Sequence, residues 1–375
     1  MRILYITRSD SAHDQRFLKA LAESKHDIYA LRISHQGKDP VTPEGVKEVP
    51  WSKPTSKLTV LNIPVLVGRL KKIIDTVKPD LIHAGPIQDG AFLAAKTGFS
   101  PLMSMSWGFD LLKDAERNAW MRRLTKYALK HTQILFVDCQ TVAKKAQSLG
   151  YGSGQLFQMP WGVDINWFSP AEAKEPGRKL RESLGWQDKF VLLGLRAWEP
   201  NYGMDVLAKA FVRAAKAEPR LRLILLNQGS QEKEIRSILA EGKISSLVYF
   251  GGRVQREDLP KFNGAADLYI SPSHVDGSSV SLLEAMACGT PCLVSDIPSN
   301  LEWIEQGVNG LVFQDGSVES LVSAIIGAVQ SSKLQDFAEK SHNLIIQKAD
   351  WDKNFAKLLQ TYEAIPKNLR ENYEK

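Results

Sequence analysis

The segment Ser271–Ser295 reads SPSHVDGSSVSLLEAMACGTPCLVS and contains the pattern that decides the fold. An apolar run that ends in turn residues at Pro272 predicts a buried parallel strand followed by a loop. Asp276 to Ser279 supply turn and N-cap chemistry, and the apolar residues from Val280 onward have helical spacing. The segment therefore predicts a strand, a loop and a helix whose first backbone N–H groups suit a diphosphate.

The two carboxylates of this segment are suited to holding a sugar nucleotide. Glu284 lies more than one turn into the expected helix, too far along to cap it, and can accept hydrogen bonds from ribose hydroxyls. Asp276 lies on the loop, where it can reach the sugar. The plain alternative is an ordinary capped helix with a surface glutamate, and these residues alone leave both interpretations open.

Length and composition place the chain among globular proteins of two domains. It has 375 residues, of which 43% are hydrophobic and 24% charged. The first residues, MRILYITRSD, read as a strand and not as a signal peptide, and no apolar run approaches the ~18 residues of a membrane span. The three cysteines have neither paired spacing nor a histidine cluster beside them. We therefore expect buried thiols in a reducing, cytoplasmic compartment, with no metal and no cofactor.

Charge is distributed unevenly along the chain. Residues 1–165 contain 23 Lys+Arg and 15 Asp+Glu, a net charge of +8, so the totals of 48 and 42 leave 25 and 27, a net of −2, for the rest. The first half is expected to face a membrane surface, an acidic acceptor or nucleic acid. A nucleic-acid-binding protein is disfavoured because RNA-binding signatures and zinc spacing are missing. A dehydrogenase is disfavoured because TRSDSAH, after the first strand, has no glycine.

Strand-like and helical patterns alternate twice along the chain, which predicts an α/β protein with two doubly wound parallel sheets. Ligands of such sheets bind beyond the carboxyl ends of the strands, so we expect a cleft between two domains. We expect strands at 2–7, 27–33, 80–85, 101–107, 133–138 and 156–160, and then at 190–196, 221–227, 247–252, 266–271 and 290–295. The expected domains are 1–165 and 189–345, with a linker at 166–188 and a C-terminal helical segment at 346–375.

The second half resembles the nucleotide-binding domain of family 4 glycosyltransferases, the retaining, metal-independent class built from two facing Rossmann-like domains, the GT-B fold. Their signature contains a glutamate, seven residues and a second glutamate, within a run like PSxxEGxxxxxxEAMACGxPVVAS. The resemblance covers most of 156–313 and implies that the last helix crosses back to the N-terminal domain. The matching positions are Pro272-Ser273, Asp276-Gly277, the run Glu284–Gly289, Pro291 and Ser295, supported by GGRVQREDLPKFNGAADLYISPS at 251–273 and MPWGVDINWFSP at 159–170.

The resemblance implies a donor site with three departures from the family. Arg196 matches the arginine that clamps the diphosphate, but Tyr202 stands where lysine is usual and brings no charge. Asp276 replaces the first glutamate and is one methylene shorter. Asn227 stands where the family often has glycine. Asp276 and Tyr202, together with Trp107 on the acceptor side, indicate an unusual branch of the family. The other expected donor-binding residues are Gly229, Arg253, Ser273, Gly277, Ser278, Ser279 and Val280, with Glu284 on the ribose.

On the acceptor side, SMSWGFD resembles the family's HGxD loop. Trp107 takes the place of histidine and can stack on a sugar, but it cannot relay a proton. Gly108 and Asp110 follow, and Asp110 is either the carboxylate on the acceptor side or an N-cap. Asp14 and Arg16 are expected at the mouth of the cleft and His83 at a strand end. A capping role for Asp14 and a structural role for His83 are the alternatives.

The expected reaction is transfer of a hexosyl unit from a UDP- or GDP-linked sugar to a hydroxyl of a glycan or lipid-linked glycan, with retention and without metal. Arg196, Asp276, Glu284 and Asp110 are the expected catalytic residues. A sugar-nucleotide epimerase or hydrolase on the same fold is the rival. The segment ERNAWMRRLTKYALKH, 116–131, predicts a basic amphipathic helix that either lies on an anionic membrane, as a peripheral protein of the inner face, or is an ordinary domain helix with a solvated basic face.

Overall fold

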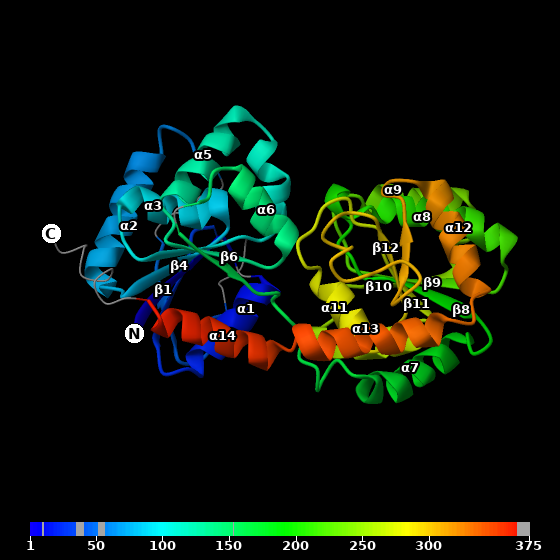
Figure 1. Cartoon of the computed structure of the whole chain (residues 1–375). Coiled ribbons are helices and arrows are strands. Elements are labelled where there is room, and N and C mark those ends of the chain that lie inside the picture. Colours follow the sequence, from blue (N-terminus) through cyan, green and yellow to red (C-terminus); the bar gives the residue numbers. More distant parts are fainter. Residues whose placement is uncertain (10, 35–40, 52–56, 153, 366–375) are drawn as a thin grey trace. The chain divides into compact units, whose positions relative to one another are not determined.

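The computed structural model describes residues 1–9, 11–34, 41–51, 57–152 and 154–365, and the chain forms two compact units. The first unit consists of Met1–Met159 and Phe355–Lys375, and the second of Pro160–Asn354. In each unit a parallel sheet is covered by helices on both faces (Figure 1). This architecture confirms the expected fold class of two Rossmann-like sheets.

The sheet of the first unit has seven strands in the order β3-β2-β1-β4-β5-β6-β7, and every described pair in it is parallel. The chain order reverses between β1 and β4, so the carboxyl ends of these two strands flank the switch point at which such sheets bind ligands. The strands are β1 (Arg2–Thr7), β2 (Asp27–Arg32), β3 (Val46–Val49), β4 (Leu81–Ala84), β5 (Leu102–Met105), β6 (Ile134–Val137) and β7 (Gln155–Gln158).

The last helix, α14 (Trp351–Glu363), begins in the second unit and ends in the first. The Tyr362 hydroxyl lies 2.5 Å from Nδ1 of His83, and Lys25 pairs with Glu363 at 2.6 Å. The expected return of the C-terminal helix to the N-terminal domain is thereby confirmed, although residues 366–375 of the expected segment lie outside the described residues. The other helices here are α1 (Ala12–Ala22), α2 (Ile63–Val77), the π-helix η1 (Ile87–Ala91), α3 (Phe92–Thr97), α4 (Phe109–Leu112), η2 (Asp114–Glu116), α5 (Ala119–Lys130) and α6 (Gln140–Ser148).

The sheet of the second unit has six strands in the order β10-β9-β8-β11-β12-β13, again all parallel. Its strands are β8 (Phe190–Gly194), β9 (Leu221–Leu226), β10 (Val248–Gly252), β11 (Leu268–Ser271), β12 (Cys292–Ser295) and β13 (Leu311–Phe313). Its helices are α7 (Pro170–Leu184), η3 (Pro200–Tyr202), α8 (Met204–Ala217), α9 (Glu232–Glu241), η4 (Ser245–Leu247), η5 (Arg256–Asp258), α10 (Leu259–Ala265), α11 (Val280–Ala287), α12 (Val318–Val329) and α13 (Leu334–Lys348).

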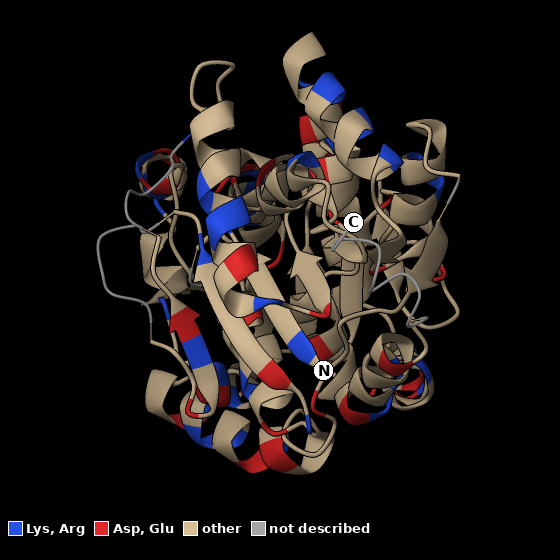
Figure 2. Ribbon diagram, turned by 90° about the vertical axis from the view of Figure 1, so that its left-hand side faces the viewer, with Lys and Arg blue, Asp and Glu red and all other residues tan. Residues whose placement is uncertain are grey.

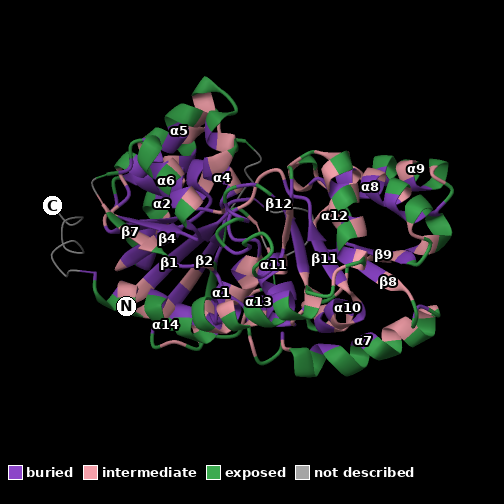
Figure 3. Ribbon diagram, turned by 45° about the vertical axis from the view of Figure 1, so that its right-hand side comes forward, coloured by how far each residue is buried: buried purple, intermediate pink, exposed green. Residues whose placement is uncertain are grey.

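The core of each unit is its sheet, because helices on both faces shield the strands from water (Figure 3). Strands such as β6, ILFV, are buried at every residue. Each strand expected from an apolar run is present. The structure adds β3, whose VKEV sequence is polar and half exposed at the sheet edge, and β13, which has only three residues.

The segment 166–188, expected to be a linker with a short helix, contains the 15-residue helix α7. This helix packs on α10 through backbone contact at two glycines. A Cβ atom at Gly264 would lie 1.9 Å from the Ala173 carbonyl oxygen, and one at Gly177 would lie 2.2 Å from the Gly264 carbonyl carbon. Only glycine permits this approach, so α7 is an integral part of the second unit.

Candidate functional site

The predicted donor residues follow the carboxyl ends of neighbouring strands in the second unit. Arg196 lies two residues beyond β8, Asn227 directly follows β9, Arg253 directly follows β10, and Ser273 lies two residues beyond β11. Parallel strands end at one edge of their sheet, so these loops share the edge at which open α/β sheets bind ligands.

The guanidinium of Arg196 is the centre of a group of donor-site residues. Its Nη2 donates to Oδ2 of Asp276 at 2.5 Å, and its Nη1 donates to the hydroxyls of Ser279 at 2.7 Å and Ser281 at 3.0 Å. Its central carbon lies 4.2 Å from the centroid of the Tyr202 ring. The structure thus brings together four predicted residues, and it adds Ser281, which carried no signal in the sequence beyond its polarity.

The Arg196–Asp276 ion pair is largely withdrawn from solvent. The exposed fraction is 11% for the arginine side chain and 15% for the aspartate side chain. Burial raises the pKa of Asp276 above its ordinary value, although Arg196 opposes this. Burial works against the charge of Arg196, but Asp276, Tyr202 and Tyr269 outweigh it and leave the pKa of the guanidinium above its usual range. A fixed positive charge therefore lies beside the start of α11.

Ser279 occupies the N-cap position of α11, but its side chain makes no capping hydrogen bond. Its hydroxyl accepts from Arg196 instead. The hydroxyl of Ser281 lies 2.9 Å from the hydroxyl of Tyr269, a residue of β11. Strand β11 thus contributes to the hydrogen bonds around Arg196. The first N–H groups of α11 are thus not capped by Ser279, which is the condition for an anion to use them.

Glu284 is the second predicted carboxylate, and it is 4% exposed in α11. Nε of Arg256 donates to its Oε1 at 3.0 Å. The sequence had singled out Arg253, three residues earlier, which is exposed to solvent. Arg256 was missed because nothing in the spacing distinguishes the two arginines of this loop.

The remaining donor-side residues shape the loops. Asn227 adopts φ +74°, the left-handed region that favours glycine, and its side-chain amide donates to the Leu195 carbonyl at 3.3 Å. A Cβ atom at Gly229 would lie 2.3 Å from the Trp198 carbonyl oxygen. Ser278 is buried and accepts a hydrogen bond from Trp303 Nε1 at 3.1 Å. Ser273 and Gly277 are buried, and Val280 is half-buried.

One unpredicted pair joins the loop after β11 to the loop after β13. His274 Nδ1 is 2.6 Å from Oδ1 of Asp315, and the His274 backbone N–H donates to the Asn201 carbonyl at 2.9 Å. These contacts join the loop after β11 to η3 and to the loop after β13, and so hold the loop that carries Asp276.

In the first unit, Asp110 is almost fully buried and engaged by its own loop. Its Oδ1 accepts from the Ser106 hydroxyl at 2.6 Å and from the backbone N–H groups of Trp107 and Leu111 at 3.0 and 2.9 Å. Its Oδ2 accepts from the Ile87 N–H at 3.0 Å. Burial raises its pKa to about 6, against the lowering effect of these bonds. Gly108, not Asp110, is the N-cap of α4, and the hydrogen bonds of Asp110 fix the loop that carries the half-buried Trp107.

The other acceptor-side residues differ in burial: Asp14 and His83 are buried, whereas Arg16 is half-buried. Ser11, not Asp14, is the N-cap of α1. Asp14 is buried and accepts from the hydroxyls of Tyr5 at 3.0 Å and Ser11 at 2.6 Å. His83 is fully buried against Tyr362, and burial lowers its pKa to about 3. Arg16 is half-buried on α1, and Gly108 takes φ +80° before α4.

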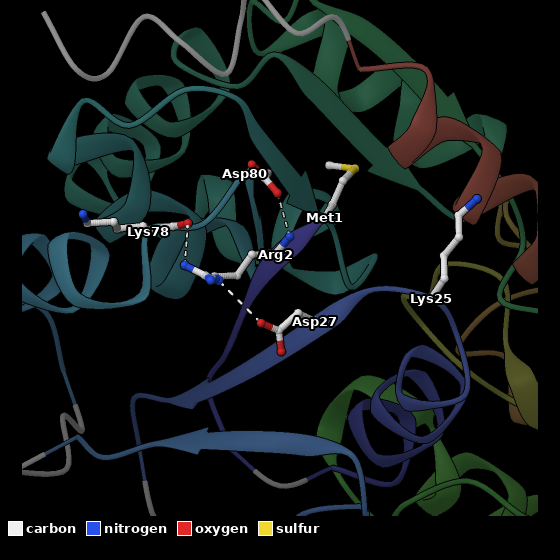
Figure 4. Close-up of a pocket in the computed structure, with 6 residues that line it drawn as sticks. All are labelled: Met1, Arg2, Lys25, Asp27, Lys78 and Asp80. Carbon is white, nitrogen blue, oxygen red and sulfur yellow. Dashed lines mark hydrogen bonds and ion pairs between the residues drawn. The ribbon is translucent and has the colours of Figure 1, made fainter.

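A shallow pocket of the first unit lies at the opposite edge of its sheet (Figure 4). Arg2 begins β1, Asp27 begins β2 and Asp80 precedes β4. The Arg2 backbone N–H donates to Asp80 at 2.7 Å, and its guanidinium donates to the Val77 carbonyl at 2.6 Å. These groups tie the amino ends of three strands together, away from the edge where ligands of such sheets bind.

The residues that the structure describes contain neither a metal-binding cluster nor a membrane-spanning helix. Among them, no three His, Cys, Asp or Glu side chains lie close enough together to hold a metal ion. No described helix has both the length and the apolar character needed to cross a membrane.

Two family profiles match the chain in the two halves that the fold defines. Residues 177–349 match the family described as glycosyl transferases group 1, and residues 2–139 match glycosyl transferase 4-like proteins. The chain belongs to the group 1 glycosyltransferases. The family suggested by the Asp276–Glu284 segment is thereby confirmed, as is the glycosyltransferase class of the enzyme.

This glycosyltransferase is similar to several curated proteins. One relative is a GDP-mannose-dependent monoacylated alpha-(1-6)-phosphatidylinositol monomannoside mannosyltransferase of Corynebacterium glutamicum. The two sequences are 28% identical over 185 residues, and this alignment covers 47% of this chain and 48% of the relative. This chain is also 24% identical over 275 residues to a GDP-mannose-dependent alpha-(1-6)-phosphatidylinositol monomannoside mannosyltransferase of Mycolicibacterium smegmatis, with 70% of each chain covered. The match thus spans about half the length of the first relative.

Solved structures of similar fold cover nearly the whole chain. Sucrose-phosphate synthase from Thermosynechococcus elongatus aligns with a TM-score of 0.82 at 17% identity, over 97% of this chain and 98% of that one. Anabaena Alr3699/HepE in complex with UDP-glucose aligns with a TM-score of 0.79 at 20% identity, over 97% and 100%. At these identities the likeness confirms the fold.

Proposed function

We propose that this glycosyltransferase moves a hexosyl unit from a nucleoside diphosphate sugar to a hydroxyl acceptor, with retention and without a metal ion. The observation that carries the proposal is the Arg196 group at the start of α11, where a largely buried cation and N–H groups without a side-chain cap suit a diphosphate. The names of its relatives, which include GDP-mannose-dependent enzymes and a protein solved with UDP-glucose, support a UDP- or GDP-linked donor.

The proposed mechanism depends on electrostatic stabilisation of the leaving diphosphate. Arg196 neutralises the charge that develops as the bond to the sugar breaks, and the Tyr202 hydroxyl adds a hydrogen bond. Asp276 accepts hydrogen bonds from sugar hydroxyls, and Glu284 accepts them from the ribose. In the front-face route implied by the family, the departing phosphate takes the proton of the acceptor hydroxyl. Retention follows because the acceptor attacks from the side that the leaving group vacates.

We propose a glycan or lipid-linked glycan as acceptor, and a peripheral place for the enzyme on the inner, cytoplasmic face of an anionic membrane. The apolar stripe of α5 does not itself face outward, because Leu124, Ala128 and Leu129 belong to the core of the first unit. What α5 exposes is basic: Arg122, Arg123, Lys126 and Lys130 are all exposed. Figure 2, seen from the side of the first unit, shows lysine and arginine repeated along helices of this region. Charge complementarity with anionic lipid supports this placement.

The rival function is that of an epimerase or hydrolase, which would process the donor without an acceptor. A nucleotide-release assay with UDP- and GDP-linked sugars, with and without candidate acceptors, tests both functions. We expect release to depend on the acceptor and Glu284→Ala to lower donor use by at least about tenfold. A Glu284→Ala variant with wild-type rates would remove the proposed donor site, and full release without acceptor would favour the rival.

A further inference from the structure

Arg256 is held on two sides at the donor edge of the second unit. Its Nε donates to Oε1 of Glu284 at 3.0 Å, and its guanidinium carbon lies 5.0 Å from the ring centroid of the fully buried Phe168. The glutamate side chain is 4% exposed and the arginine side chain 34%. The arginine therefore has a defined position beside the carboxylate, unlike the exposed Arg253.

The geometry leaves part of the guanidinium unused. Nη2 of Arg256 is buried and makes no hydrogen bond to any residue that the structure describes. A buried donor without an acceptor is unfavourable, so a ligand that supplies an oxygen here would gain from it. The pair of side chains consequently presents an N–H donor next to a carboxylate acceptor.

A vicinal diol is the chemical complement of such a pair. One hydroxyl can donate to the carboxylate while its neighbour accepts from the guanidinium. The ribose of a nucleotide carries two adjacent hydroxyls of this kind, and a 2′-deoxy or 3′-deoxy sugar lacks one of them. The position of Arg256 also supplies a cation to a carboxylate that is almost entirely withdrawn from water, which such a carboxylate requires.

We propose that Arg256 is a positioning residue of the donor site: it orients the Glu284 carboxylate and, together with it, selects a ribose diol. The inference rests on the proposed function, in which Glu284 binds the ribose of the donor. It adds a residue that selects ribonucleotides over deoxynucleotides.

The test is nucleotide binding by calorimetry with the full chain. UDP and GDP are compared with their 2′-deoxy and 3′-deoxy forms in the wild type and in Arg256→Gln, Arg256→Lys and Glu284→Gln. In the wild type we expect the loss of one hydroxyl to weaken binding by about tenfold. In Arg256→Gln and Glu284→Gln the ratio of ribonucleotide to deoxynucleotide affinity should fall at least about fivefold. Arg256→Lys should retain part of this preference because it keeps the charge.

Arg213→Gln is the matched control, because Arg213 forms an exposed ion pair with Glu319 in the same unit. It should keep the full ribose preference. A merely structural role for Arg256 would lower the unfolding midpoint and weaken ribo- and deoxynucleotides by the same factor. If Arg256→Gln does not fold, Arg256→Lys decides: the full wild-type ribose preference in that variant overturns the role of the guanidinium, and a partial loss supports it.

The outcomes separate this inference from the proposed function. Wild-type ribose preference in Arg256→Gln, with UDP or GDP still bound, overturns the role of Arg256 and leaves the donor site intact. A wild type that binds neither nucleotide overturns the proposed function, and this inference with it. A preference that is lost in the arginine and glutamate variants but kept in Arg213→Gln supports it.

Discussion

Arg196 and Asp276 form a 2.5 Å ion pair at the start of α11, so the cation proposed for the diphosphate already holds the carboxylate proposed for the sugar. A donor must therefore enter between two groups that neutralise each other. The pair keeps Arg196 in place while the site is empty, but its carboxylate competes with the phosphates for the same N–H donors. We therefore expect Arg196 to favour the binding of the nucleoside diphosphate, and Asp276 to oppose that binding but to favour turnover of the sugar nucleotide.

The substitution Asp276→Asn should separate these effects. It removes the competing charge, so we expect UDP or GDP to bind about threefold or more tightly, whereas turnover of the sugar nucleotide falls at least about tenfold because an amide is a weaker acceptor for sugar hydroxyls. Arg196→Gln should instead weaken nucleoside diphosphate binding by about tenfold or more. Calorimetry and a nucleotide-release assay measure the two quantities. A loss of nucleotide affinity in both variants would contradict the expectation that Arg196 and Asp276 have opposite effects on nucleotide binding.

The strands and the donor loop could be predicted because they depend on local sequence. Continuous apolar runs mark buried parallel strands, and the spacing of Asp276 and Glu284 falls within one loop and one helix. The contact between Arg256 and Glu284 could not be predicted. These residues follow β10 and β11, which are separated in the sheet by β9 and β8, and only the strand order brings them together.

The same limit applies to the acceptor side. Asp14 lies on α1, His83 on β4 and Asp110 on α4, and the local sequence pattern does not show which of these polar side chains the tertiary structure turns inward. All three are buried. The edge strand β3 was missed because its lysine and glutamate are exposed, as is usual in edge strands.

The contact between α7 and α10 makes Gly264 sensitive to any side chain. Gly264→Ala would place a Cβ atom 1.9 Å from the Ala173 carbonyl, so one helix must move. We expect the free energy of unfolding to fall by about 2–4 kcal/mol in urea titrations. Gly327→Ala, in α12 with open space around its Cβ position, is the control and should be neutral or stabilising by up to about 1 kcal/mol. Equal effects at the two glycines would show that α7 does not pack closely.

Two exposed apolar residues, Val60 and Leu61, lie just before α2 and should strengthen membrane binding. Val60 and Leu61 are 69% and 89% exposed, and the neighbouring Lys57 is exposed as well. The double substitution Val60→Asp and Leu61→Asp should weaken co-sedimentation with anionic vesicles by about tenfold, because it replaces insertable side chains with charges that the lipid repels.

Two apolar residues of the second unit provide the control for this experiment. Leu301 and Val308 are 49% and 42% exposed, and their substitution by aspartate should leave vesicle binding unchanged. Zwitterionic vesicles should bind the wild type weakly. Equal binding of anionic and zwitterionic vesicles, or equal losses in both double variants, would argue against a membrane contact through the first unit.

Stability should fall as pH rises through the range in which Asp14 ionises. Burial raises the pKa of this carboxyl from 3.8 to about 6, although hydrogen bonds from Ser11 and Tyr5 oppose the rise. The folded state therefore holds the proton more tightly than the unfolded chain. The corresponding stability is fully present below pH ~4 and is lost as pH rises through about 6, an effect on the order of 3 kcal/mol.

The substitution Asp14→Asn should flatten the dependence of the unfolding free energy on pH between about 4 and 7, measured by urea titration at several pH values. Asp110 shifts in the same direction and remains in both proteins, so the informative quantity is the difference between the two curves. Asp27 makes a contribution to stability with the opposite pH dependence. The hydrogen bond from Lys47 lowers the pKa of Asp27, so its contribution is lost as pH falls, and Asp27→Asn should remove that loss. Parallel curves for the wild type and Asp14→Asn would mean that the carboxyl remains ionised inside the first unit, with its two hydroxyl partners, Ser11 and Tyr5, compensating for burial.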